Sequence, residues 1–309
     1  MVSSDGFLNK PHEFSSRDNN IKRAVVLGSS GWFGKNAMEI LRNRGIEVLP
    51  LASSIKSIEM PGFTFQTNIF DLAKVNDFCP ELVIDAAFLT REYFESVGEN
   101  TFRSTNEILI EQAMEIAKIQ SVKKFMGFSS GAVHDLNTHS SISAASRAYA
   151  ELKANYEDRL NAEFSSSRKN LTIMRTFSVS GRHANRVENF AFTEFIRGAL
   201  SGKIEIRSST PTFRRYVSIA DILEVGLKIQ DAGVRFIESG GNLIEMQELA
   251  EKIAQQLNPK TKIFRDLKDE AVSIYASDNK TWLAALDDTG HIPQTLEKQI
   301  LDTAAFIRA

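Results

Sequence analysis

The chain has 309 residues, a formal net charge of −2 and 42% hydrophobic side chains, a composition that excludes a disordered or collagen-like protein. Because the net charge is close to zero, neither nucleic acid nor an anionic membrane is an expected partner. The single cysteine, Cys79, cannot form an internal disulfide, and no apolar run is long enough for a membrane span. We therefore expect a cytoplasmic protein.

The order of the predicted elements indicates the fold class. Residues 1–21 are polar without apolar periodicity, which predicts a disordered tail. From residue 23, short β-branched runs alternate with helical patterns, which is typical of a parallel sheet with crossover helices. Strands are expected at 24–27, 47–51, 63–67, 82–86, 124–128 and 171–177, and helices at 36–42, 101–119 and 144–164. The pattern predicts an α/β, Rossmann-type, doubly wound parallel sheet.

The pattern changes after residue 180. An extended run is expected at 213–219, and the helical stretches that follow the change are 187–200, 221–229, 246–257 and 296–307. Residues 22–180 therefore form the predicted sheet domain, to which 213–240 are expected to return. Residues 181–212 and 241–309 form a smaller, mostly helical part.

Three glycines spaced three apart separate the first predicted strand from the first predicted helix, in the run GSSGWFG. There Gly28 allows a tight turn, Gly31 lets a pyrophosphate approach the backbone, and Gly34 packs the helix against the strand. The free N–H groups at the helix N-terminus then face the phosphates. The turn predicts a dinucleotide site, and a glycine-rich turn that binds nothing is the alternative. The predicted cofactor contacts here are Gly28, Ser30, Gly31, Trp32, Phe33 and Gly34.

The end of the second predicted strand bears on the choice of dinucleotide. Proteins with this turn often carry an acidic residue there that binds the ribose 2′-hydroxyl, but residues 51–54 read LASS. Ser53, Ser54 and Lys56 can donate to a 2′-phosphate instead. The sequence thus favours NADP, with NAD as the alternative, although these residues also fit a loop that is only solvated.

Tyr149 and Lys153 lie four residues apart in a predicted helix, so they share one face. An ammonium beside a phenol favours the phenolate, which predicts a pKa for Tyr149 below its usual value near 10. The tyrosine can then exchange a proton with a substrate hydroxyl while hydride moves to or from a nicotinamide. An ordinary exposed pair is the alternative.

Ser129 and Ser130 follow the predicted strand at 124–128 directly. They stand at the carboxyl end of a strand, where open α/β sheets bind ligands. The hydroxyl of Ser130 can donate to a carbonyl oxygen that becomes an alkoxide, whereas that of Ser129 is expected to bond the backbone. A Ser-Gly turn without catalytic function is the alternative.

Five segments in this order, GSSGWFG, VIDAA, FSSGAV, YAELK and MRTFSVSG, resemble the extended short-chain dehydrogenases/reductases, the epimerase/dehydratase group that modifies nucleotide-linked sugars. The resemblance covers residues 22–309. It implies NAD(P) binding by the sheet domain, substrate binding by the smaller part, and a homodimer built from 101–119 and 144–164. Ser130, Tyr149 and Lys153 take the catalytic positions, and Lys153 would also hold the nicotinamide ribose.

The resemblance also implies contacts at a distance from the catalytic residues. Asp71 would lie near the adenine, and Ala86 and Ala87 beside the cofactor; Ser53 and Asn68 complete the predicted cofactor contacts.

On the substrate side, Asn189 and Arg214 fall where such enzymes hold a nucleotide diphosphate, and an arginine fork suits phosphate oxygens. Thr90 belongs to a segment expected to line the sugar pocket, together with Ser130. A helix cap at Asn189 and a solvated Arg214 are the alternatives.

The departures from the family pattern narrow the reaction. Gly131 and Ala132 stand where dehydratases of this group carry an Asp-Glu pair, so dehydration is not expected. The missing ribose carboxylate favours a keto-sugar reductase that uses exchangeable NADPH, with an epimerase that retains NAD as the alternative. A non-catalytic dinucleotide sensor and a reductase of small carbonyl or flavonoid-like compounds are further hypotheses. The five histidines show no ligand spacing, so no catalytic metal is expected.

Overall fold

The computed structural model describes residues 21–138, 142–268 and 271–308. Its centre is a six-stranded parallel sheet in the order β11-β7-β6-β5-β1-β2. Its strands are β1 (Arg23–Leu27), β2 (Glu47–Leu51), β5 (Leu82–Asp85), β6 (Lys124–Ser130), β7 (Asn170–Thr176) and β11 (Gly233–Glu238). Every residue of β5 and β6 is buried, as expected for a parallel sheet with both faces covered.

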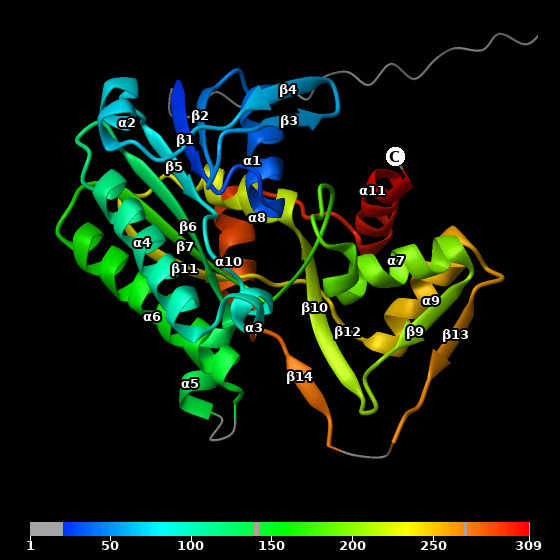
Figure 1. Ribbon diagram of the computed structural model, residues 1–309. Coiled ribbons are helices and arrows are strands. Elements are labelled where there is room, and N and C mark those ends of the chain that lie inside the picture. The colour runs from blue at the N-terminus through cyan, green and yellow to red at the C-terminus, as the bar shows by residue number, and fades with distance from the viewer. Residues whose placement is uncertain (1–20, 139–141, 269–270, 309) are drawn as a thin grey trace, which may run out of the picture.

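Helices cover the two faces of this sheet (Figure 1). On one face lie α4 (Glu99–Ala117) and α6 (Ala144–Ser165), and on the other α1 (Trp32–Asn43), α8 (Ile219–Lys228) and α10 (Lys280–Thr289). Successive side chains of β6 point to opposite layers, so Phe125 belongs to the apolar cluster under α4 and α6, and Met126 to the cluster under α1 and α8. The predicted Rossmann-type fold is confirmed.

The prediction for residues 63–67 was wrong in its placement. β4 (Phe63–Gln66) pairs antiparallel with β3 (Ser57–Met60) and does not join the parallel sheet. Pro61 and Gly62 make the two-residue connection, with Gly62 at φ +81°, because this dipeptide suits a type II turn. Asn68 alone forms an isolated bridge to Leu51 at the end of β2.

Short elements complete the first half of the chain. They are α2 (Leu72–Phe78), η1 (Arg91–Tyr93), α3 (Phe94–Val97), η2 (Gly131–His134) and α5 (Asp135–Thr138), where η denotes a 3₁₀ helix. The predicted tail at 1–21 lies almost entirely outside the described residues.

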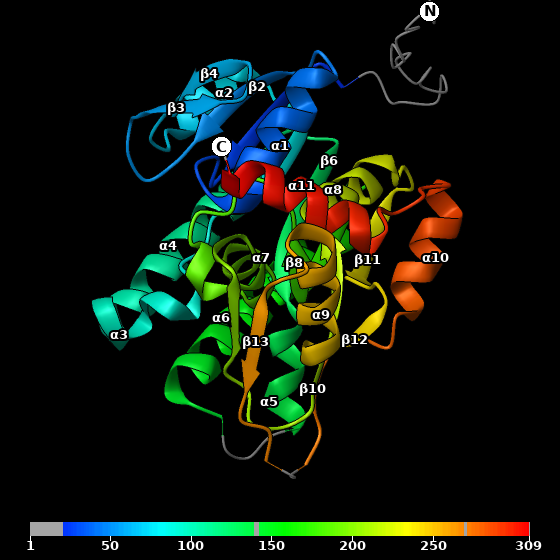
Figure 2. The same cartoon turned by 90° about the vertical axis from the view of Figure 1, so that its right-hand side faces the viewer.

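A second lobe lies beside the carboxyl ends of the central strands (Figures 1 and 2). Its helical elements are η3 (Val187–Asn189), α7 (Ala191–Ser201), α9 (Met246–Leu257) and α11 (Leu296–Arg308). Its strands are β8 (Ser178–Ser180), β9 (Lys203–Ile206), β10 (Thr212–Ser218), β12 (Leu243–Glu245), β13 (Lys262–Arg265) and β14 (Ser273–Tyr275). β10 pairs with β12, β14 and β8, whereas β11 extends the parallel sheet, so 213–240 contributes to both parts.

In both views α11 lies between α1 and α9 (Figures 1 and 2), and it binds the segment that leaves the sheet. Gln299 accepts a hydrogen bond from the Ser180 hydroxyl (2.6 Å), and Thr303 accepts one from the Gly181 amide (3.1 Å). No helix within the described ranges combines the length and apolar character needed to cross a membrane.

Candidate active site

The glycine turn between β1 and α1 is a backbone cradle. Gly28 has φ +72°, and a Cβ there would lie 2.6 Å from the carbonyl oxygen of Ala86, which follows β5. A Cβ on Gly34 would overlap the Gly28 carbonyl oxygen and lie 2.6 Å from Ser29 Cα. No side chain caps the N-terminus of α1, which begins after Gly31. These features suit a pyrophosphate held by backbone N–H groups.

Trp32 and Phe33 support this turn from within the core. The Trp32 indole N–H donates to the carbonyl oxygen of Arg182 (2.6 Å), and its ring packs on Phe190 with centroids 5.0 Å apart. Phe33 packs on Phe128, centroid to centroid 4.5 Å. A cofactor contact from the buried Trp32 would therefore come from its backbone, whereas the Phe33 ring is only partly buried.

Three predicted cofactor residues gather near the end of β2. Ser53 is exposed in the loop that follows this strand, and the Asn68 carbonyl accepts from the Ala52 amide (2.8 Å). The Asp71 carboxylate caps α2 by accepting from the amides of Ala73 and Lys74. Both amides donate to its Oδ1. The predicted place near the adenine stays a prediction.

Lys35, in the first turn of α1, was missed by the sequence reasoning. Burial lowers its pKa, and the nearby Lys56 lowers it further. Two cations thus lie near the end of β2, where the sequence lacks a carboxylate. Only the fold could show this pairing, because the two residues are 21 positions apart.

Lys153 is buried on the face of α6 that meets the sheet. Its Nζ donates to the carbonyl oxygen of Phe128 (2.7 Å) and lies 3.6 Å from the centroid of the Phe88 ring. Burial lowers the pKa of Lys153 to about 8, while Asp85 and Glu157 act in the opposite direction. The ammonium is held by a carbonyl and an aromatic face.

Tyr149 differs from the sequence expectation in its electrostatics. Its pKa is raised, chiefly by burial and next by Tyr275, whereas an interaction with the Ser130 hydroxyl lowers it. Phe88 contacts Tyr149 edge-on, with centroids 5.6 Å apart, and also covers the Lys153 ammonium. The shared helix face therefore does not produce the predicted lowering, because Lys153 is directed to Phe128 and Phe88.

Ser130 stands at the end of β6 as the N-cap of η2. Its Oγ accepts from the Ala132 amide (3.2 Å) and lies 3.4 Å from the Tyr275 hydroxyl. The prediction for Ser129 was wrong, since its hydroxyl is buried without a hydrogen-bond partner among the described residues. The structure brings Ser130 and Tyr149 together at the carboxyl end of the sheet.

Tyr275, from β14, was also missed by the sequence reasoning. Besides approaching Ser130, its ring packs on Phe177 (5.1 Å between centroids), and the guanidinium of Arg214 lies 5.5 Å from its centroid. Tyr275 thereby links Ser130, the predicted catalytic serine, to the predicted phosphate-binding arginine. No local pattern indicates this, since 145 residues separate it from Ser130.

Thr90 and Asn189 lie on two segments that approach each other. Thr90 precedes η1 and Asn189 ends η3, and both residues are exposed. The Arg186 guanidinium stacks over the Tyr93 ring at 4.0 Å, which joins the two segments. Their predicted substrate contacts stay predictions.

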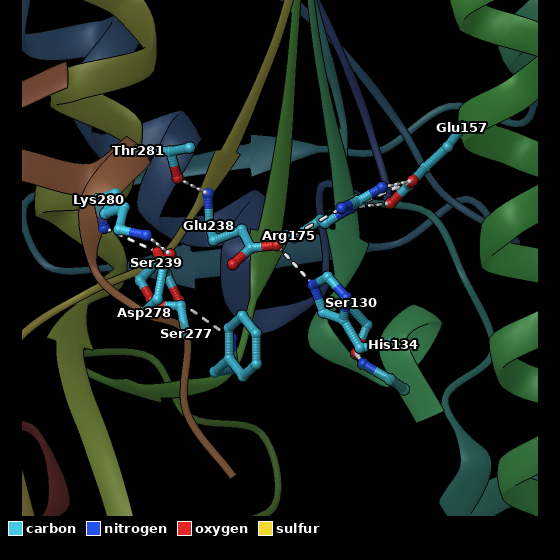
Figure 3. A network of polar contacts seen from close by, with 12 residues as sticks. Ser130, His134, Glu157, Arg175, Glu238, Ser239, Ser277, Asp278, Lys280 and Thr281 are labelled. Carbon is cyan, nitrogen blue, oxygen red and sulfur yellow. Dashed lines mark hydrogen bonds and ion pairs between the residues drawn. The ribbon is translucent and has the colours of Figure 1, made fainter. Parts of the chain in front are cut away.

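A network of charged side chains contacts η2 through His134 (Figure 3). Arg175 binds Glu157 through Nε (2.9 Å) and Nη2 (2.6 Å), and its Nη1 lies 3.4 Å from Glu238. Glu238 in turn contacts the ring of His134 at the end of η2. Within the described ranges no group of three or more His, Cys, Asp or Glu side chains is arranged to hold a metal.

A hollow of about 440 Å³ in the second lobe lies apart from these residues. It is lined by Pro211, Glu245, Gln247, Arg265 and Leu267. The Arg265 guanidinium is already bound to Glu245, Ser208 and Thr210, which leaves little capacity for an anion. Ser130 and Tyr149, rather than this hollow, therefore mark the candidate active site.

Comparison with known families agrees with this geometry. Residues 24–235 match the model of the NAD dependent epimerase/dehydratase family. The chain belongs to this family. It is therefore an enzyme of the extended short-chain dehydrogenase/reductase type, as the sequence motifs predicted. No curated protein matches the chain.

Solved structures of this family share the fold. The UDP-N-acetylglucosamine 4-epimerase from Methanobrevibacter ruminantium M1, in complex with UDP-N-acetylmuramic acid, is 18% identical with a TM-score of 0.73. The UDP-glucose 4-epimerase from Bifidobacterium longum, with NAD+ and UDP, and the NAD-dependent NDP-hexosamine 5,6-dehydratase TunA are each 15% identical with TM-scores of 0.69. Each comparison covers 93% of this chain and 98% of the other.

Proposed function

We propose that this family member moves hydride from and to the sugar of a nucleotide-diphosphate sugar, with Tyr149 exchanging the proton. The observation that carries the proposal is a series of contacts that connects the glycine turn to helix α6. Ala86 closes on Gly28, and Phe88, two residues further, contacts both Tyr149 and Lys153. A sugar bound against Ser130 would therefore lie beside a dinucleotide held by the turn.

The residues of the turn fit a nicotinamide dinucleotide, which supplies the hydride acceptor and donor when bound. Lys153 would hold its ribose, and Ala87 would line its pocket. Ser130 donates a hydrogen bond to the reacting sugar oxygen. As a phenolate, Tyr149 would take the proton of the sugar hydroxyl during oxidation, and as the resulting phenol it would return that proton to the oxygen during reduction. Burial raises the pKa of Tyr149 and so favours the phenol form.

We favour epimerisation over net reduction as the overall reaction. The structures of similar fold include 4-epimerases of UDP-sugars, one of them with NAD+, and Gly131 and Ala132 provide no carboxylates for dehydration. Arg214 beside Tyr275 is the proposed ligand of the nucleotide diphosphate. The helices α4 and α6 are the proposed homodimer surface.

A second candidate, the keto-sugar reductase, rests on Lys35 and Lys56. Two cations, with no carboxylate among residues 51–54, favour a 2′-phosphate, and NADPH suits net reduction. Titration of both reduced cofactors tests this point. We expect Lys56→Glu to weaken NADPH binding about tenfold while NADH binding changes little, because only NADPH carries the phosphate. Equal effects on both cofactors would remove the basis for NADP.

The test of the proposed function is turnover of a panel of UDP, GDP, CDP and dTDP sugars, with products identified by NMR. An epimerase yields an epimer of the substrate sugar without net consumption of reduced cofactor. A reductase consumes one equivalent of reduced cofactor per product. Tyr149→Phe should lower kcat about 1,000-fold with cofactor affinity unchanged. Tyr216→Phe is the matched control, since that buried hydroxyl contacts only the Met246 sulfur among the described partners. Unchanged turnover in Tyr149→Phe would refute the role of Tyr149.

A further inference from the structure

A buried carboxylate lies behind the catalytic lysine. Asp85, at the end of β5, is 4% exposed. One of its oxygens accepts from the Tyr156 hydroxyl (2.7 Å) and the other from the Ala87 amide (3.1 Å). Burial raises the pKa of Asp85, whereas the Tyr156 hydroxyl, the Ala87 amide and the charge of Lys153 act in the opposite direction. Because both oxygens accept hydrogen bonds, the arrangement suits the ionised carboxylate.

The sheet is shaped to admit this contact. Tyr156 projects from α6, three residues after Lys153, and reaches Asp85 across Gly127 of β6, which is the register partner of Asp85. A Cβ on Gly127 would overlap the Tyr156 hydroxyl and lie 3.1 Å from its Cζ. Gly127 thus leaves room for a phenol whose hydroxyl is the donor to a buried carboxylate.

The partners of the buried charges indicate which group Asp85 acts on. Two carboxylates, Asp85 and Glu157, act on the Lys153 ammonium. Glu157 is already bound by the fork of Arg175 through two nitrogens and is thereby neutralised. Asp85 has only neutral hydrogen-bond donors, so its charge is available to Lys153.

The geometry places Asp85 close to the ammonium without a direct ion pair. The Nζ of Lys153 binds the carbonyl of Phe128, the residue after Gly127, and lies 5.3 Å from the Tyr156 ring centroid. No carboxylate in the described part of the chain lies within 4.0 Å of this Nζ, while the ammonium and Tyr156 pack on each other. Asp85 and Lys153 are both buried, so little water screens the charge of Asp85 at the ammonium.

We propose that Asp85 is a positioning residue whose buried carboxylate, held by Tyr156, is the counter-charge that keeps the Lys153 ammonium protonated and in place. This inference rests on the proposed function and adds a residue to its machinery. The titratable and charged groups around Lys153 are Asp85, Tyr149, Tyr156, Glu157 and Arg175. Of these, Asp85 alone combines a negative charge with the absence of a cationic partner of its own among the described residues.

The consequence concerns the upper pH limit of activity. The pKa of Lys153 is about 8 with Asp85 in place. Removal of the opposing charge should lower the pKa by about one unit. The fraction of charged lysine at pH 8, and with it turnover, should then fall about fivefold.

The experiment measures the lysine directly in the full chain without substrate or cofactor. Protein with ¹³C-labelled lysine is titrated by NMR between pH 6 and 10, and the Lys153 signal is assigned through Lys153→Arg. Asp85→Asn should lower the pKa of Lys153 by about one unit. Because no turnover is needed, failure of the proposed function would not affect this result, and a failed inference would leave sugar turnover intact.

Matched variants separate charge from folding. Asp221→Asn removes another buried carboxylate, bound to Ser218, His291 and Gln294, and should leave the Lys153 titration unchanged. Tyr156→Phe removes the donor to Asp85 and should lower the pKa of Lys153 by a smaller amount, whereas Tyr216→Phe should not. If Asp85→Asn does not fold, the two tyrosine variants decide the question. An unchanged Lys153 titration in Asp85→Asn, or in Tyr156→Phe if only that variant folds, would overturn the proposal.

Discussion

The glycine turn and the face of α6 that carries Tyr149 and Lys153 are built in different ways. The turn consists of closely packed backbone atoms, where a Cβ on Gly28 would overlap Ala86 and one on Gly34 would overlap Gly28. The α6 face consists of side chains on a regular helix. There Lys153 and Tyr156 are held by hydrogen bonds to buried partners, the Phe128 carbonyl and the Asp85 carboxylate. One region therefore depends on shape and the other on charge.

This difference determines how each region responds to substitution. At Gly28 and Gly34, one methyl group would displace backbone, so binding and stability should fail together. On α6, a substitution that keeps the side chain's shape changes protonation while the fold survives.

Gly34→Ala should cost about 3 kcal/mol of the free energy of unfolding and abolish cofactor binding, because the new Cβ overlaps the Gly28 carbonyl. Gly31→Ala is the matched variant, since a Cβ there would lie 3.2 Å from the same oxygen. It should fold almost normally and bind the cofactor weakly. Denaturant unfolding and cofactor titration measure the two effects, and equal stability losses would contradict the division.

Lys153 should make stability and activity respond to pH in opposite directions. Its folded pKa, about 8, lies below the ordinary 10.5, so between these values the unfolded chain binds more protons and stability rises with pH. The gain is of the order of 3 kcal/mol, whereas activity should decline above pH 8 as the ammonium is lost. Unfolding curves at pH 7.5 and 10 measure the gain, which Lys153→Met should remove. A gain that persists in this variant would assign it to another group.

Glu39, on α1 beside the glycine turn, links this helix to a neighbouring segment through its side chain. It binds His183 (2.6 Å) and Arg182 (2.9 Å), which joins α1 to the segment entering the second lobe. The hydrogen bond from His183 is the largest cause that lowers the pKa of Glu39 below 4.5. Its contribution is therefore present above pH 4.5 and is lost as the pH falls through the folded value.

We expect Glu39→Gln to lower the free energy of unfolding by about 1 kcal/mol at pH 7, since the carboxylate is partly exposed. The difference from the unmodified chain should shrink below pH 4.5. Thermal unfolding at pH 7 and pH 4 measures this, with Glu205→Gln in the exposed Lys203 pair as the control. A difference that stays constant with pH would show that the Glu39 charge contributes nothing.

Local patterns predicted the parts of the site that are close in sequence. The glycine turn could be predicted because β1, the turn and α1 are consecutive, and Tyr149 and Lys153 because helical spacing places them on one face. Ser130 followed from its place after a buried strand. The same reasoning failed for the pKa of Tyr149, because burial and next Tyr275, 126 residues away, raise it.

The sequence alone determined the order of strands and helices, the glycine turn and the residues that face one side of α6, since these depend on periodicity and spacing over a few residues. Tertiary structure alone decided that Tyr275 meets Ser130, that Tyr156 reaches Asp85 over Gly127, and that residues 63–66 form a hairpin outside the sheet. Such contacts depend on strand register and on which side chains exclude water from one another, and no local sequence pattern specifies either.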